Sequence, residues 1–189
     1  MRKPLTLVRI AVLILMLGVP LVFAASPPTT NNLDSIVMLG RSSGWATGAS
    51  GTVLYFDGSS WSSIPSGTNL DLMGLSFGPP SAVSSTSGFA VGGLGGLAAA
   101  IHWDGTAWTS ITQGLSSPTA QKLSSVFEVS STDAWAVDSA SGAIFHWTGM
   151  SRLGGGWNLV STATGGLNSI FMSSPTEGWA VGTGGIIYH

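Results

Sequence analysis

The sequence has no cysteine, so it can form neither a disulfide nor a thiolate metal site. Charged residues make up only 7% of the chain, against about 25% in ordinary soluble proteins. The helix-favouring residues Glu, Lys, Gln and Arg are scarce, whereas Gly, Ser, Thr, Val and Trp, which suit short strands and turns, are frequent. We therefore expect an all-β protein that is held together by packing alone.

The N-terminus has the pattern of an export signal. Arg2, Lys3 and Arg9 provide positive charge ahead of, and at the start of, an apolar stretch over residues 10–23. Small or apolar residues follow at Val22–Ala24, where a signal peptidase would read the chain. This pattern predicts a cleaved signal peptide and a secreted, extracellular or periplasmic location.

A retained membrane anchor is the alternative for the same segment. The apolar run is shorter than the roughly 20 residues that a spanning helix needs, and Pro20 lies within it. We therefore favour a signal peptide over residues 1–24, followed by a linker over residues 25–32. Contact with a membrane is expected only if the signal segment is not cleaved.

Without residues 1–24 the chain carries three basic and eight acidic residues, a net charge of 3 − 8 = −5. Nucleic acids and anionic membrane surfaces are both recognised through basic patches. The charge therefore excludes nucleic acid as an expected partner.

An aromatic residue followed by alanine recurs along the chain at nearly constant spacing. The four copies are Trp45, Phe89, Trp135 and Trp179, at intervals of 44, 46 and 44 residues. A similar apolar segment precedes each copy: LDSIVM at 33–38, LMGLSF at 72–77, LSSVFEV at 123–129 and LNSIFM at 167–172. Agreement over several columns in four copies indicates a repeat architecture.

Each repeat is predicted to hold four short strands, of which the last begins at a tryptophan. The closing tryptophans are Trp61, Trp108 and Trp157. In the first two repeats an Asp-Gly pair precedes the closing strand, at Asp57-Gly58 and Asp104-Gly105. Asp-Gly is typical of tight hairpins in which both turn residues adopt positive φ.

Four strands in about 40–45 residues are the signature of a β-propeller blade. We therefore predict an all-β β-propeller with four-stranded blades of about 44 residues, three complete and a fourth incomplete. The repeats span residues 33–69, 72–121, 123–166 and, incompletely, 167–189. An open solenoid of hairpins is the alternative.

The fourth repeat lacks its closing strand, so we expect the chain to be a fragment of a larger propeller. A four-bladed ring with an open edge is the other possibility, and such an edge could support self-association. In either case we expect the aromatic column that contains Trp135 to pack between neighbouring blades.

Two segments carry a resemblance to known proteins: GWAVGTGGIIYH at 178–189 and HWDGTAW at 102–108. They resemble exported propellers of the photosystem II assembly-factor-like group and of the broader group with sialidase-type Asp-box (BNR-like) repeats. The resemblance covers residues 33–189 and implies a propeller fold. Members of the first group are non-catalytic binding proteins that help a membrane complex assemble, and the second group includes glycosidases.

The Asp-box pattern S-x-D-x-G-x-x-W is not fully present. Glycine directly follows aspartate in this chain, and Thr148 replaces the aspartate in the third repeat. A sialidase-type site also uses three arginines, whereas the chain after residue 24 has Arg41 and Arg152. These departures count against a glycan-active site in this part of a propeller.

The ionisable residues occupy repeated positions, which favours structural roles. Asp57 and Asp104 share one turn position, so turn hydrogen bonding is more probable than acid–base catalysis. The three histidines, His102, His146 and His189, share one column, and equivalent positions on different blades lie too far apart to bind one metal ion. Asp138 replaces a glycine of the repeat, and we interpret it as a turn residue rather than a site residue.

We expect no cofactor, no metal and no catalytic residues in this chain. The leading hypothesis is an exported scaffold that binds a protein or a glycan through its blade loops. Two insertions provide the candidate partner loops, and they contain Pro79, Pro80 and Arg152. The alternative is a truncated glycan-active, sialidase-like enzyme whose catalytic residues lie in missing blades.

Overall fold

The computed structural model describes residues 28–78, 86–116, 118–149 and 155–189. The expected signal peptide, residues 1–24, and the loop residues Pro79, Pro80 and Arg152 lie outside this described part. The strands form four antiparallel sheets, three of four strands and one of three. In the described residues no helix has the length and apolar character needed to cross a membrane.

Each sheet is a blade whose strands follow in chain order. Blade 1 comprises β1 (Leu33–Met38), β2 (Gly44–Gly48), β3 (Val53–Phe56) and β4 (Trp61–Ser63). Blade 2 comprises β5 (Leu72–Ser76), β6 (Gly88–Leu94), β7 (Leu97–Trp103) and β8 (Trp108–Ser110). The first strand of each begins at the leucine that starts the repeat.

The second half of the chain repeats this order. Blade 3 comprises β9 (Leu123–Ser130), β10 (Asp133–Asp138), β11 (Ala143–Trp147) and β12 (Trp157–Thr162). Blade 4 comprises β13 (Leu167–Ser174), β14 (Glu177–Gly182) and β15 (Ile187–Tyr188). Short 3-10 turns follow β2 and β14, at Ala49–Gly51 and Thr183–Gly185.

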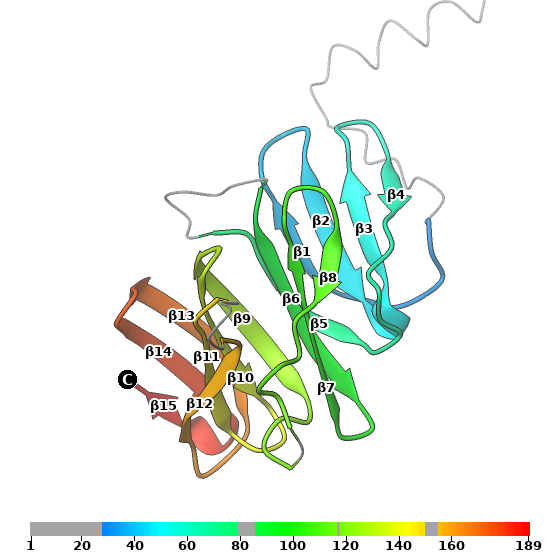
Figure 1. Cartoon of the computed structure of the whole chain (residues 1–189). Coiled ribbons are helices and arrows are strands. Elements are labelled where there is room, and N and C mark those ends of the chain that lie inside the picture. Colours follow the sequence, from blue (N-terminus) through cyan, green and yellow to red (C-terminus); the bar gives the residue numbers. More distant parts are fainter. Residues whose placement is uncertain (1–27, 79–85, 117, 150–154) are drawn as a thin grey trace, which may run out of the picture.

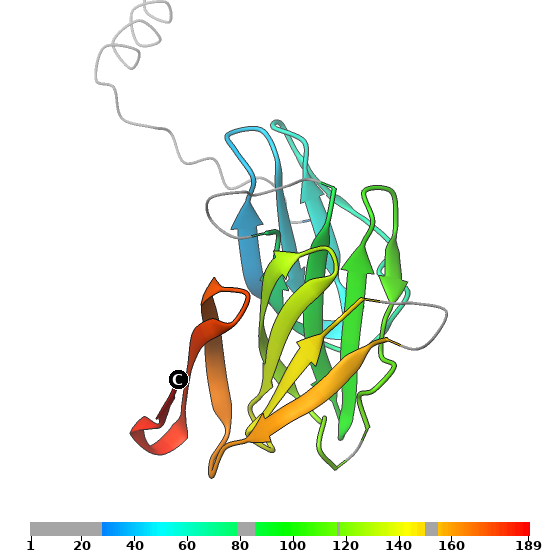
Figure 2. The ribbon, with the colours of Figure 1, turned by 60° about the vertical axis from the view of Figure 1, so that its left-hand side comes forward.

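The blades stack face to face in chain order (Figures 1 and 2). The first strands of successive blades, β1, β5, β9 and β13, lie against one another, so they form the inner side of the stack. Neighbouring strands within a blade run antiparallel, as an up-and-down blade requires. The predicted fold class, a β-propeller with three complete blades and a partial fourth, is confirmed.

The pattern of each second strand, an aromatic residue, Ala and then Val (Thr in blade 1), places side chains on both faces of the blade. In β6, Phe89 and Val91 pack toward blade 3, whereas Ala90 between them packs toward blade 1. Alternation of this kind follows from the two-residue period of a strand. Large side chains thus project toward the following blade, and small ones receive the large side chains of the preceding blade.

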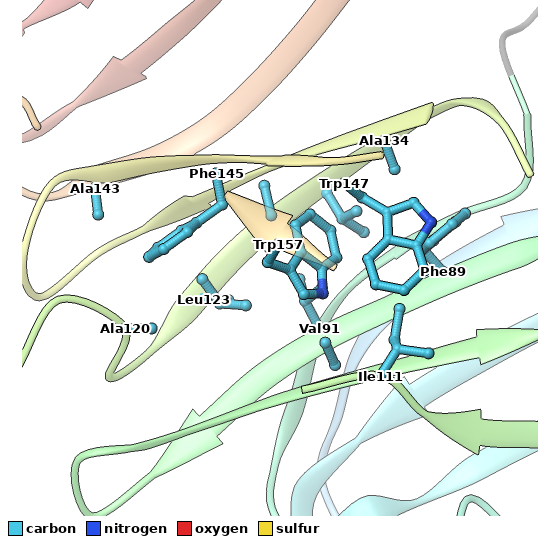
Figure 3. Packing of buried hydrophobic residues seen from close by; sticks show 13 residues of the cluster. Phe89, Val91, Ile111, Ala120, Leu123, Ala134, Ala143, Phe145, Trp147 and Trp157 are labelled. Atoms are coloured by element: carbon cyan, nitrogen blue, oxygen red, sulfur yellow. The ribbon is translucent and has the colours of Figure 1, made fainter. Parts of the chain in front are cut away.

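Three buried apolar clusters result, one at each junction between blades. The cluster between blades 2 and 3 contains the aromatic rings of Phe89, Trp147 and Trp157 (Figure 3). Trp157 is the first residue of the outermost strand of blade 3, yet only 2% of it is exposed. Trp108 of blade 2 has the same position and packs edge-on against Trp45 of blade 1.

Burial of the repeated aromatic column decreases toward the C-terminal blade. Trp45 and Phe89 are buried, Trp135 is half-buried, and Trp179 is 40% exposed. The reason is that the first three residues face a following blade, whereas no described blade follows Trp179. The column therefore packs between blades where a following blade is present, and not in blade 4.

The two outer faces of the stack are apolar for the same reason. Ile36 in β1 is 61% exposed and Ile187 in β15 is 71% exposed. Their counterparts at the junctions are less exposed: Leu75, at the position of Ile36 in blade 2, is buried, and Ile144, at the position of Ile187 in blade 3, is half-buried. Both faces thus have the chemistry of an inner junction without a neighbouring blade.

The Asp-Gly turns differ from the expected geometry. Four residues, Asp57 to Ser60, connect the paired residues Phe56 and Trp61, and only Gly58 has a positive φ, of 96°. Asp57 instead accepts hydrogen bonds at Oδ1 from the backbone N–H groups of Ser59 and Ser60, both at 2.8 Å. The expectation that both residues adopt positive φ is therefore wrong, because the aspartate caps a longer turn with its side chain.

Substitution along the aromatic column tests the contribution of blade stacking. Phe89→Ala removes a fully buried ring, and we expect a loss of about 3–5 kcal/mol in the free energy of unfolding. Trp135→Ala should cost less, and Trp179→Ala least, because their rings are progressively more exposed. Denaturant unfolding followed by circular dichroism measures all three values, and an equal loss in the three variants would contradict the stacking order.

Candidate functional site

A polar contact recurs in every blade beside the aromatic column. The residue two positions before each aromatic contacts the polar tip of a ring on the third strand. The four pairs are Ser43–Tyr55 at 3.4 Å, Ser87–His102 at 3.1 Å, Asp133–His146 at 2.9 Å and Glu177–His189 at 3.5 Å. This repetition in all four blades indicates a structural role.

The rings of the three histidines also contact the aromatic column. Ring centroids lie 4.6 Å apart for Phe89 and His102, and 4.2 Å apart for Trp135 and His146. Each histidine therefore has its own aromatic and polar neighbours within its own blade. Among the described residues no three His, Asp or Glu side chains lie close enough to hold a metal ion.

One buried carboxylate departs from the repeat. Glu128 in β9 occupies the column position that Phe77 and Met172 fill in blades 2 and 4, and only 1% of it is exposed. Its Oε2 accepts a hydrogen bond of 2.8 Å from the backbone N–H of Gly78, and its Oε1 accepts one from the hydroxyl of Ser87. Both donors belong to blade 2, so this carboxylate joins blades 2 and 3.

Glu128 also fixes the connection that carries one candidate loop. β5 ends at Ser76 and β6 begins at Gly88, so Gly78 and Ser87 are the two stems of the intervening segment. The backbone N–H of Glu128 donates in turn to Ser76 Oγ at 3.0 Å. Glu128 thus makes three hydrogen bonds, two as acceptor and one as donor, and they hold both ends of the connection between β5 and β6.

A serine, a histidine and a carboxylate thus meet, in an arrangement that our sequence analysis did not find. In a nucleophilic triad the imidazole lies between the hydroxyl and the acid. Here Ser87 lies between the other two residues: its hydroxyl donates a hydrogen bond to Glu128, and its oxygen contacts His102 Nε2. The hydroxyl faces a carboxylate rather than a base oriented by one, so the geometry supports a structural chain of hydrogen bonds and not a catalytic triad.

Burial has the largest effect on the pKa values of the two ionisable groups in this hydrogen-bonded network, Glu128 and His102. Burial raises the pKa of Glu128, and hydrogen bonds from Ser87 and Gly78 oppose the rise only in part. Burial lowers the pKa of His102, against a smaller opposing effect of the Asp104 charge. Both shifts favour the neutral forms, as expected for groups enclosed between two apolar blade faces.

Asp138 is also buried, but the hydrogen bonds to its carboxylate come from backbone N–H groups. Burial acts to raise its pKa, yet hydrogen bonds from four backbone N–H groups outweigh burial, and the net pKa is lowered. The donors are Ser141, Gln121, Lys122 and Ala140, at 2.7–2.8 Å. Asp138 therefore ties the β10–β11 turn to the segment before β9, which is the role of a turn residue.

The turn aspartates are exposed and ionised. Hydrogen bonds from Ser60 and Ser59 lower the pKa of Asp57 to about 2. Those from Thr106 and Ala107 lower the pKa of Asp104 to about 2. Each carboxylate is occupied by its own turn, so neither is arranged for acid–base chemistry with a second group.

The blade topology gathers the candidate loops at one end of the stack. Because neighbouring strands are antiparallel, the connections between the first and second strands and between the third and fourth strands leave the same end. The ends of the 77–87 and 148–156 connections lie there, together with the two Asp-Gly turns. We call this end of the stack the loop end.

The pH dependence of stability tests the buried position of Glu128. The raised pKa means that the folded protein favours the protonated carboxyl, so stability is highest below the unfolded pKa near 4.5 and falls as pH rises through the folded pKa. Glu128→Gln, which mimics the protonated form, should remove that fall. We therefore expect the variant to gain stability relative to the wild type between pH 4 and pH 8 in denaturant titrations.

Asp138→Asn is the matched control, with the opposite sign. Its lowered pKa contributes stability above the unfolded value of 3.8, which is lost as pH falls through the folded pKa. The wild type should therefore exceed this variant most at neutral pH. A stability difference between wild type and Glu128→Gln that does not change with pH would contradict the assignment.

The similarity of this chain to known proteins concerns its fold. No protein-family model and no curated protein matches the chain. Among solved structures, "YCF48 bound to D1 peptide" matches with a TM-score of 0.60 and 20% identity, over 84% of this chain and 49% of that one. "YCF48 from Cyanidioschyzon merolae" matches with a TM-score of 0.61 and 19% identity, over 87% of this chain and 55% of that one.

The chain thus spans about half the length of the solved chains that it matches. At this level of identity the likeness concerns the fold. Together with the blade topology, it shows that the described strands form successive blades of a β-propeller of the kind seen in YCF48.

Proposed function

We propose that this chain is part of an exported, non-catalytic scaffold that recognises a protein through the loop end of its blades. The observation that carries the proposal is the way Glu128 holds both stems of the 77–87 connection. A loop used for recognition needs a rigid base, and a buried carboxylate from the neighbouring blade supplies one.

A protein ligand is favoured over a glycan. One YCF48 structure with the same fold is bound to a peptide, D1. In the described part of this chain, the acids and histidines that could act in glycan cleavage are engaged in turns or stacked within single blades. These contacts support a binding role, and nothing in them favours the alternative of a glycan-active enzyme.

Export is the second element of the proposal, and it rests on the first 24 residues. A positive segment, an apolar segment and a small-residue cleavage site follow in the order of a signal peptide. N-terminal sequencing of the protein recovered from the periplasm or medium tests this element. We expect Ala25 as the first residue, and a protein that begins at Met1 and stays with the membrane would contradict it.

Binding through the loop end is tested with a displayed library of random linear peptides as the probe. Peptides selected on the wild type should bind at least tenfold more weakly to a variant carrying Pro79→Ala, Pro80→Ala and Arg152→Ala. The substitutions lie in the two insertions, so they should leave the blade junctions and the melting temperature unchanged.

The matched control alters the opposite end of the stack. Leu94 and Leu97 flank the β6–β7 hairpin, and both are exposed. Leu94→Ala together with Leu97→Ala should leave peptide affinity unchanged. Selected peptides that bind the loop-end variant as tightly as the wild type would overturn the proposal.

A further inference from the structure

The β6–β7 hairpin of blade 2 is longer than the equivalent hairpins of the other two complete blades. β7 has seven residues, whereas β3 has four and β11 has five. The register pairs of β6 and β7 continue as far as Leu94 and Leu97. The turn therefore consists of Gly95 and Gly96, and both have the positive φ that a tight type I′ hairpin requires.

The outermost strand of blade 2 covers only part of β7. Register pairs join β8 to β7 from Ile101 to Trp103. The backbone N–H of Ile111 then donates to the carbonyl of Ala100 at 2.9 Å. Among the described residues no strand pairs with the outer side of β7 from Leu97 to Ala99, where β7 continues past the end of β8 (Figure 1).

Ala98 presents its backbone groups to this open side. Successive residues of an antiparallel strand direct their N–H and C=O groups to opposite sides, so residues two apart share a side. The carbonyl of Ala100 points outward to Ile111, and Ala98 therefore points outward as well. Leu97 is 62% exposed and Ala98 is half-buried, so solvent reaches this edge. The edge belongs to a complete blade that has a described blade on either side.

A groove of about 330 Å³ follows the same edge. The alanines of β7, Ala98 to Ala100, line it together with Leu70 of the segment from blade 1. Thr112 and Leu115 of the segment toward blade 3 also line it. The described lining residues include no ionisable side chain, so a charged side chain would lose water there without gaining a counterion.

Blade 3 shows what occupies the equivalent edge when it is covered. The registers of the two blades align Ala99 of β7 with Ala143 of β11. β12 extends along β11 as far as that alanine, where Thr162 pairs with Ala143 and Ser161 precedes it. An extended strand with small, uncharged side chains therefore fits this position in the blade.

We propose that the groove beside β7 binds an extended segment of another polypeptide, with small uncharged side chains, as an added strand. The segment pairs with the backbone of Ala98 and continues the line of β8. Strand addition supplies a donor and an acceptor to the open backbone groups, which a small apolar molecule could not do. The groove lies at the opposite end of the stack from the loop end, so the proposal does not depend on the function proposed above.

A synthetic peptide tests the proposal directly. The probe is residues 158–164, NLVSTAT, which include the pair that covers the equivalent edge in blade 3, with a fluorophore at the N-terminus. We expect saturable binding to the full-length protein, measured by fluorescence anisotropy. Absence of saturable binding would overturn the proposal.

Two N-methylated forms of the probe test whether it binds as a strand. One carries the methyl group on the backbone nitrogen of Ser161, and the other carries it on that of Thr162. Because neighbouring N–H groups of a strand point to opposite sides, one methyl group faces β7 and the other faces away. We expect one form to bind at least tenfold more weakly and the other to bind like the unmodified probe. Equal affinities of the two forms would contradict strand addition.

Protein variants locate the binding. Ala98→Pro removes the outward N–H at an edge position where proline is tolerated, and it should weaken binding at least tenfold. Thr112→Trp places a large ring in the groove from an exposed position and should abolish binding. Thr109→Trp is the matched control, because Thr109 is exposed on β8 and does not line the groove. Unchanged binding by Thr112→Trp, or an equal loss with Thr109→Trp, would overturn the proposal.

The same variants separate this groove from the loop end. The protein with Pro79→Ala, Pro80→Ala and Arg152→Ala should bind the probe as tightly as the wild type. An equal loss of affinity in that protein would place the probe at the loop end and overturn the proposal. Library peptides that lose affinity for Thr112→Trp belong to the groove, and they are set apart before the loop end is tested.

A second copy of the chain, pairing β7 with β7, is the competing occupant. Analytical ultracentrifugation of the wild type and of Ala98→Pro separates the two cases. The proposal predicts the same sedimentation for both proteins, with one peptide taken up by the wild type. A wild-type dimer that takes up no peptide and that Ala98→Pro converts to a monomer would overturn the proposal.

Discussion

Each blade of this protein can bury its large aromatic side chain only against the blade that follows. A four-stranded sheet has two faces and no interior, so the core consists of the three junctions between blades. With no disulfide to add stability, the fold depends on these junctions. The alternation of a large aromatic with alanine makes the dependence directional, because the large side chain points forward and the small ones receive it.

Two further features follow from this constraint. A polar group placed in a junction is removed from water and must find hydrogen-bond partners there, which Glu128 of blade 3 finds in blade 2. Trp179, which no described blade covers, is 40% exposed.

The repeat could be predicted from the sequence because it is a local pattern. The aromatic at 44–46-residue spacing, the leucine that opens each first strand and the tryptophan that opens each last strand all lie within short segments. The polar network could not be predicted in the same way. Glu128 is visible as a departure from an apolar column, but its partners Gly78 and Ser87 are 50 and 41 residues away and come together only through blade stacking. The burial of each aromatic likewise depends on whether a blade follows, which no local pattern encodes.

Hydrogen exchange resolved along the chain tests the central claim most directly, because it reports the local stability of each blade. The equivalent second strands β6, β10 and β14 are each paired on both sides, although β14 pairs with β15 at two positions only, and they differ in their coverage by a following described blade. We expect their amide protection to decrease in that order, with β14 and β15 exchanging first. Protection of β14 equal to that of β6 would show that a blade is stable without the blade that follows it, and would contradict this account.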